Sequence, residues 1–217
     1  MSHGKTMETR ALKAALLEEL RRPCEAAGFR YVRTKERFVR ETPAARQAFA
    51  FDFAIYNWLD VAPGLSLRLQ EVEAIFHRTS GFEKKYQAET ATLSATLRSL
   101  AGDETTYSYR IASAADVTGV ATRVEDDFQG IVLPYFAENA SLSRVDELLN
   151  SDPEAPCRHN LNEYHRCAYG LIVGHLCHRK DYSRLVEVYR RKMATTNNGF
   201  FLPRLDALVN DLLTIER

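Results

Sequence analysis

The stretch that decides the fold is Gln47-Ala-Phe-Ala-Phe-Asp-Phe-Ala-Ile-Tyr-Asn-Trp58. Its large apolar residues fall on every second position, and residues two apart share one face of a β-strand. The sequence therefore predicts a central strand over residues 47–58. One face carries Phe49, Phe51, Phe53 and Ile55, and the other carries Ala50, Asp52, Tyr56 and Trp58.

Composition excludes some classes of protein. Lys plus Arg and Asp plus Glu each total 29 among the 217 residues, so the net charge is zero and gives no general attraction to nucleic acid. No stretch approaches the roughly 18 continuous apolar residues of a membrane span, and no export signal is apparent. Four scattered cysteines in a chain of this size favour reduced thiols. We expect a cytoplasmic protein that does not insert into a membrane.

The order of patterns along the chain predicts an α+β fold. An amphipathic helix over residues 7–27 precedes a hairpin over 29–41, the strand 47–58 and an alternating stretch over 65–69. Apolar and polar residues alternate again over 105–112, whereas apolar residues recur at three- and four-residue spacing after Ser113. Because strands and helices are segregated, we expect a single domain over residues 1–217, with an antiparallel meander of five to six strands (7–112) and a helical half (113–217) packed on it.

Several local signals set the expected boundaries. Pro23 should kink or end the first helix, Pro63-Gly64 should form a turn, and Pro134 should kink or end the helix that begins at Ser113. Ser113 and Asp116 have the spacing of a capping box, and Ser143 is placed to cap a helix that ends at Asn150. The apolar residues fall on odd-numbered positions up to Leu69 and on even-numbered positions at Val72, Ala74 and Phe76. This change of strand face favours a β-bulge after Leu69. Three further helices are expected over 160–179, 182–194 and 202–215.

Cysteines and histidines gather in one region of the sequence, at Cys157, His159, His165, Cys167, His175, Cys177 and His178. Only His175 and His178, three residues apart on a helix, with Cys157 reaching in, could share a zinc ion. No Cys-x-x-Cys pair or His-Glu-x-x-His motif accompanies them, so we expect core and surface residues. Cys157 beside His159 is the best-placed candidate nucleophile, but a buried thiol is the commoner role. No glycine-rich phosphate loop is present, and we predict no metal and no cofactor.

Glu71 and Glu73 are the one pair of carboxylates placed for acid–base chemistry. On a strand they would share a face, where like charges raise one pKa. A solvated or edge-protecting strand face is the commoner role of such a pair. A small-ligand or enzyme site between sheet and helices, using Glu71, Glu73 or the His175 region, therefore remains open.

The neutral chain is locally polarised. Residues 28–46 carry six basic and two acidic residues, whereas residues 115–150 carry two basic and seven acidic residues, among them Glu125, Asp126 and Asp127. The basic hairpin, with Tyr31 and Phe38, leaves RNA binding open, although the aromatic motif of RNA-recognition folds is missing. Complementary charge also accelerates and selects a protein partner.

The face that carries Asp52, Tyr56 and Trp58 has the composition of a protein-binding hot spot, provided that helices leave it uncovered. We predict a partner contact through these three residues or through Glu125, Asp126 and Asp127. No residue is predicted to be catalytic, and the oligomeric state stays open.

The order of a helix, Ala27-Gly28-Phe29-Arg30, Arg37-Phe38-Val39-Arg40, a Phe-rich strand and a helical last third resembles a group of uncharacterised bacterial domain-of-unknown-function proteins. Some of that group accompany polymorphic toxins and look like immunity proteins. The resemblance implies a bacterial, non-enzymatic protein that occludes or tethers a protein partner, such as a toxin. It assigns no catalytic residue to any position.

Overall fold

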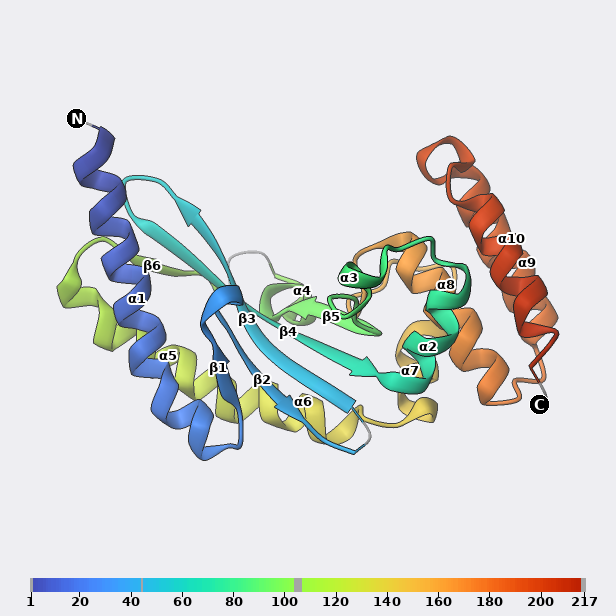
Figure 1. Ribbon diagram of the computed structural model, residues 1–217, viewed down its shortest axis with the longest axis horizontal. Helices are drawn as coiled ribbons and strands as arrows, with labels where there is room; N and C mark the ends of the chain where they lie inside the picture. The colour runs from blue at the N-terminus through green and yellow to red at the C-terminus, as the bar shows by residue number, and fades with distance from the viewer. Residues whose placement is uncertain (1, 44, 104–106, 216–217) are drawn as a thin grey trace. The chain divides into compact units, whose positions relative to one another are not determined.

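The computed structural model describes residues 2–43, 45–103 and 107–215, with backbone only for residues 2–8, and it confirms the α+β class (Figure 1). Its strands are β1 (Arg30–Val32), β2 (Arg37–Glu41), β3 (Ala45–Ile55), β4 (Leu59–Leu69), β5 (Leu93–Thr96) and β6 (Tyr109–Ile111). Its α-helices are α1 (Ser2–Ala26), α2 (Gln70–Thr79), α3 (Lys84–Gln87), α4 (Leu97–Ala101), α5 (Val117–Asp127), α6 (Leu133–Glu138), α7 (Leu142–Asn150), α8 (Glu163–Leu176), α9 (Tyr182–Thr195) and α10 (Leu202–Leu212).

The chain divides into two compact units, each built from two separate stretches of sequence. Unit 1 comprises residues 1–66 and 95–137, and unit 2 comprises residues 67–94 and 138–217. This grouping differs from the division at residue 112 that the sequence suggested, because β4 and β5 each contribute residues to both units. The single domain stays a prediction.

The strands pair in the order β1-β2-β3-β4-β5, and β6 lies beside β4. The β1–β2, β2–β3 and β4–β6 pairs are antiparallel. Phe38 of β2 stands opposite Phe49 of β3, so both rings lie on the same face of the sheet. This register places the aromatic side of β3 over the core of unit 1.

β3 lies between β2 and β4, which confirms the predicted central strand, and helices cover its aromatic face. Phe49 is fully buried, and its ring lies 5.1 Å from that of Phe128 in the π-helix Phe128–Val132, between α5 and α6. Phe29, just before β1, contacts Phe128 as well, at 5.4 Å between ring centroids. Ile55 has the same parity but is 63% exposed, because it stands at the far end of β3. Burial thus fades along the strand toward the hairpin that joins β3 to β4.

Prolines interrupt the helices less than the sequence predicted. The sequence predicted that Pro23 would kink or end the first helix. α1 continues through Pro23 and ends three residues later, at Ala26, so the predicted end at Pro23 is wrong. The helix that follows Ser113 also continues through Pro134, because a π-helical turn precedes the proline and widens the backbone there. The capping box of Ser113 and Asp116 is confirmed.

Two predicted strand features are also wrong. Pro63 and Gly64 lie inside β4, and the turn falls earlier, at residues 56–58. An added Cβ at Gly64 would approach the carbonyl oxygen of Ala95 to 3.2 Å, so the glycine permits β5 to pass close by. The residues after Leu69 form helix α2 and not a β-bulge, because Val72 and Phe76 are spaced for one helical face and are both buried.

The later elements agree with the predictions within a few residues. α8, α9 and α10 are the three expected C-terminal helices, and β6 lies within the alternating stretch, whose residues 105 and 106 lie outside the described part of the chain. α7 is capped by Ser141 and not by Ser143, since the Ser141 hydroxyl accepts the backbone N–H of Arg144. In unit 2, α8 is the central helix, buried from Tyr164 to His175 except for a half-buried His165.

Candidate functional site

The hairpin between β3 and β4, in unit 1, carries the aromatic residues that the sequence singled out. β3 ends at Ile55, and the backbone N–H of Tyr56 donates to the carbonyl of Trp58 at 2.8 Å, which closes the turn. Trp58 therefore lies in the turn, and the prediction that it shares a strand face with Asp52 is wrong. The two aromatic rings remain in contact, with 5.3 Å between their centroids.

β6 supplies a third member of this group. Arg110 stands opposite Asp60 of β4, and its guanidinium carbon lies 3.7 Å from the centroid of the Trp58 ring. Such cation–π stacking restricts both side chains. Ile55, Tyr56, Trp58 and Arg110 are called the hairpin-tip patch below. Ile55 is 63% and Tyr56 59% exposed, Trp58 is half-buried, and Arg110 and Asp52 are exposed.

The predicted acidic residues lie at the end of α5, and their environments differ. Asp126 is exposed, whereas Glu125 and Asp127 are half-buried. The hydroxyl of Tyr109 donates a hydrogen bond to Asp127, and burial raises the pKa of this carboxyl above its usual value. Asp127 is thus held within unit 1, and Asp126 is the member of the three most accessible to a partner.

β6 separates the acidic residues from the hairpin-tip patch. Tyr109, which bonds Asp127, and Arg110, which stacks on Trp58, are consecutive in this strand. Successive side chains of a strand point to opposite faces. The two predicted contact sites therefore lie on opposite sides of β6, and the structure does not bring them together.

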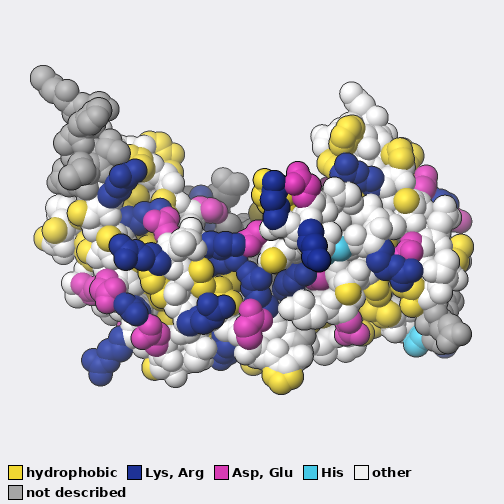
Figure 2. Space-filling view, in the orientation of Figure 1, with side chains coloured by type: hydrophobic (Ala, Val, Ile, Leu, Met, Phe, Trp, Pro, Cys, Tyr) yellow, Lys and Arg dark blue, Asp and Glu magenta, His cyan; other side chains and the backbone are white. Residues whose placement is uncertain are grey.

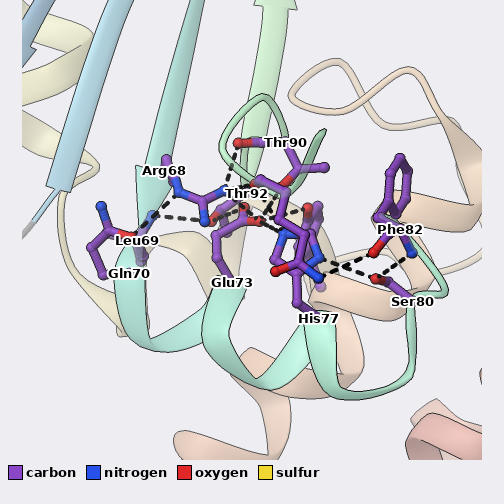
Figure 3. Close-up of polar contacts among 11 residues, drawn as sticks. Arg68, Leu69, Gln70, Glu73, His77, Ser80, Phe82, Thr90 and Thr92 are labelled. Carbon is purple, nitrogen blue, oxygen red and sulfur yellow. Dashed lines mark hydrogen bonds and ion pairs between the residues drawn. The ribbon is translucent and has the colours of Figure 1, made fainter. Parts of the chain in front are cut away.

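The other candidate site, in unit 2, is a buried carboxylate cluster around Glu73. The cluster comprises Arg68 at the end of β4, Glu73 and His77 of α2, Thr90 and Thr92 before β5, and Tyr169 of α8. Figure 3 shows Arg68, Thr90 and Thr92 converging on Glu73, with His77 toward Ser80. Glu73 is completely buried, and its donors come from β4, from the segment before β5 and from α8.

Four donors occupy the Glu73 carboxylate. Its Oε2 accepts from Arg68 Nη1 at 2.9 Å, the Thr90 hydroxyl at 2.6 Å and the Tyr169 hydroxyl at 3.1 Å, while Oε1 accepts from the Thr92 hydroxyl at 3.0 Å. Burial raises the pKa of Glu73, and these donors and the Arg68 charge oppose the rise. A carboxylate has about four acceptor positions, so little capacity is left for accepting a substrate proton. The geometry supports a clamp that joins β4, α2 and α8.

His77 extends the cluster toward the segment between α2 and β5. Its Nε2 lies 3.1 Å from the carbonyl of Gln87 and 2.9 Å from the Thr90 hydroxyl, and its Nδ1 lies 3.0 Å from the Ser80 hydroxyl. Burial and the nearby Arg68 lower the pKa of His77, which favours the neutral ring. A neutral ring with its proton on Nε2 donates toward Gln87 or Thr90 and accepts the Ser80 hydroxyl.

The predicted arrangement of Glu71 and Glu73 is wrong. Both belong to α2, where residues two apart point about 200° from each other around the helix. Glu71 is exposed and Glu73 is buried, so the two do not form a carboxylate pair. The spacing of Glu73 and His77, four apart on one helical face, was a sequence signal for this cluster that an assumed strand concealed. Tyr169 and the two threonines had no local signal.

The cysteines and histidines after residue 156 do not converge on a shared site. Within the described residues, no group of three or more His, Cys, Asp or Glu side chains is placed to hold a metal ion. Burial raises the pKa of the Cys167 thiol to about 12. The Cys157 thiol is buried and donates to the carbonyl of Leu148, so it packs as a structural residue. His175 is buried and its Nε2 lies 3.3 Å from the carbonyl of Ile215.

Stability should decline as the pH falls through the histidine range. Burial lowers the pKa of His77, His159 and His165, so the unfolded chain binds more protons than the folded chain below about pH 6.5. The raised pKa of Glu73 has the opposite effect, because at this group the folded chain binds more protons than the unfolded chain as the pH falls. The His165→Phe variant isolates the contribution of His165, because a phenylalanine ring can take the place of a ring that already packs against Phe76 at 5.6 Å.

We expect the free energy of unfolding of the wild-type protein to decrease more steeply than that of His165→Phe when the pH is lowered from about 7.5 to about 5.5. Urea unfolding followed by circular dichroism at both pH values measures the difference. Equal decreases in the two proteins would show that the protonation of His165 does not contribute to the pH dependence.

No helix in the described part of the chain is long and apolar enough to cross a membrane. Comparisons with protein-family models, with curated proteins and with solved structures find no match.

Proposed function

We propose that this protein is a binding module that contacts a protein partner through the hairpin-tip patch. In this proposal, binding is itself the activity, and the module occludes or tethers its partner in the manner of an immunity protein or adaptor. The sequence resemblance described above supports that role, and the patch supplies the contact surface.

The observation that carries the proposal is the group of contacting aromatic rings at the tip, with the Tyr56 ring exposed. Trp, Tyr and Arg are the residue types that dominate binding hot spots, and here one of each lies within a single hairpin and its neighbouring strand. Tyr56 is 59% exposed although its ring contacts Trp58, and Ile55 beside it is 63% exposed. Stacking with Arg110 holds Trp58 in place before binding, which reduces the entropy lost when a partner docks.

The other candidate surfaces offer fewer exposed groups for a ligand or partner to contact. In the basic hairpin, Phe38 is fully buried, so the expected exposed aromatic pair for RNA is absent at that position. Arg40 of the same hairpin donates to the carbonyl of Ala27 and to Gln47 and stacks over Phe29, so much of its hydrogen-bonding capacity is used internally. The Glu73 carboxylate is engaged by four donors, which supports a structural role over a ligand site.

Site-specific photo-crosslinking tests the proposal. A photoreactive phenylalanine analogue replaces Tyr56 in one variant and Tyr86 in another, since Tyr86 of α3 is a tyrosine of similar exposure, at 51%. We expect irradiation of cells that express each variant to give a discrete protein adduct from position 56 and none from position 86.

Trp58→Ala in the position-56 variant should abolish the adduct, because it removes the ring that orders the tip. An adduct of equal yield at both positions, or one that survives Trp58→Ala, would contradict binding through the patch. Asp126→Lys, introduced into the position-56 variant, tests the acidic surface separately. If Asp126→Lys abolished the adduct and Trp58→Ala did not, the partner contact would be assigned to α5.

A further inference from the structure

A groove of about 470 Å³ lies in unit 1 between α1 and β1. Leu17, on one side, is buried, and Tyr31, on the other, is half-buried. The groove residues of α1 recur at three- and four-residue spacing and therefore form one stripe along the helix. The lining consists of Ala14, Leu17, Glu18, Arg21, Tyr31 and Arg33.

The strand beside the groove is the end strand of the sheet. β1 begins the sheet order, so among the described residues its ladder is with β2 alone. In an antiparallel pair, hydrogen-bonded and non-hydrogen-bonded positions alternate, so every second residue of β1 directs its N–H and C=O away from β2. These groups can pair with the backbone of an added extended chain.

The dimensions of the groove suit a short extended segment. From Ala14 to Arg21 the helix rises about 10 Å, and the three residues of β1 extend over about the same length. Tyr31 and Phe38 are register partners, so Tyr31 projects to the face of the sheet that α1 covers. An added strand would direct alternate side chains to this same face, against Ala14, Leu17 and Tyr31.

The charges that line the groove favour an acidic side chain on the ligand. Glu18 lies 3.6 Å from Arg21, which also pairs with Glu25 at 2.8 Å, so Arg21 is already engaged by two carboxylates. Arg33, the other cation of the lining, is exposed just after β1 and lies where an acidic side chain of a ligand could reach it. Figure 2 shows Lys and Arg side chains spread over the α1 and β1 side of unit 1, with Asp and Glu among them.

We propose that this groove binds an extended peptide segment of a protein partner, which adds to β1 as a further strand and places an acidic side chain beside Arg33. Backbone pairing with β1 provides the hydrogen bonds, and the stripe of α1 provides the apolar contact. This surface is separate from the hairpin-tip patch and does not depend on it.

Peptide selection on the protein of residues 1–217 provides the probe. Random nonapeptides displayed on phage are selected against the wild-type protein, and the most enriched peptide is synthesised with a fluorescent label. Fluorescence anisotropy then gives its affinity for each variant. We expect the enriched peptides to share an acidic residue flanked by alternating apolar residues.

A matched pair of substitutions tests the location. Ala14 and Ala15 are both exposed on α1, but only Ala14 lines the groove. We expect Ala14→Arg to weaken binding by more than about tenfold and Ala15→Arg to leave it unchanged. Arg33→Glu should weaken binding to the acidic peptide, and Trp58→Ala should not affect it.

The peptide backbone provides the remaining control. Methylation of the backbone nitrogens that pair with β1 should abolish binding, whereas methylation of the alternate nitrogens should not. Failure to enrich any motif, equal effects of the two alanine substitutions, or indifference to methylation would overturn the proposal. Self-association of the wild-type protein that Ala14→Arg abolishes would also overturn it, by assigning the groove to a second copy of the chain.

Discussion

Replacement of Glu73 by alanine is expected to lower the free energy of unfolding of unit 2 by about 3–5 kcal/mol. The substitution leaves the Arg68 guanidinium, whose side chain is only 12% exposed, without its carboxylate. It also removes the acceptor shared by the hydroxyls of Thr90, Thr92 and Tyr169. Urea unfolding followed by far-ultraviolet circular dichroism measures the loss, because unit 2 is mainly helical.

The double variant Arg68→Met/Glu73→Leu provides the control. A buried ion pair costs desolvation energy, so its replacement by apolar side chains of similar volume should restore much of the stability that Glu73→Ala removes. The chain has a single tryptophan, Trp58, which lies in unit 1. Its fluorescence therefore reports the unfolding of unit 1 in the same variants. If Glu73→Ala were no less stable than the double variant, the carboxylate would not be acting as a clamp.

Gly170→Ala is expected to destabilise unit 2 by at least about 1–3 kcal/mol, because it overpacks the contact between α8 and its neighbours. An added Cβ would lie 2.5 Å from Asn150 Oδ1 and 2.9 Å from the Tyr189 hydroxyl. Those two groups form a 2.6 Å hydrogen bond, and Asn150 also donates to the carbonyl of Gly170, so none of them can move freely. Chemical denaturation compared with the wild-type protein measures the loss.

Gly119→Ala is the matched control for this substitution. Gly119 lies in α5, and an added Cβ there meets no atom within 4 Å. Alanine is favoured over glycine within a helix, so this variant should gain up to about 0.5–1 kcal/mol. A gain at both positions would mean that α8 can shift to accept a methyl group, and the packing around Gly170 would then be less restrictive than its distances imply.

The sequence predicted elements well where a single periodicity extended over many residues. Phe49, Phe51 and Phe53 predicted β3, and the helical stripes after Ser113 predicted the later helices. It failed where two periodicities meet, as after Leu69. Val72 and Phe76 fit a helix and Val72, Ala74 and Phe76 fit a strand, and only packing against α8 and α10 decides between them.

The candidate sites were predictable only in part, because local sequence patterns do not specify contacts between distant residues. Tyr56 and Trp58 stood out because tyrosine and tryptophan dominate binding hot spots, so a contact through them could be proposed before the turn was located. The partners of Glu73 could not be identified, because Tyr169 is 96 positions away and threonines give no distinctive pattern. Local spacing contains no information about contacts that only the folded chain creates.

The division of each unit into two stretches of sequence has a consequence for synthesis on the ribosome. Every segment of unit 1 has been made once residue 137 emerges, so unit 1 can form while the rest of the chain is still being translated. Helix α2 emerges much earlier, but α8 and its Tyr169 do not yet exist, so the Glu73 carboxylate must stay hydrated or find temporary donors until Tyr169 has been synthesised. Nascent unit 2 is therefore a candidate client for a chaperone, during the interval in which its first segment waits for its second.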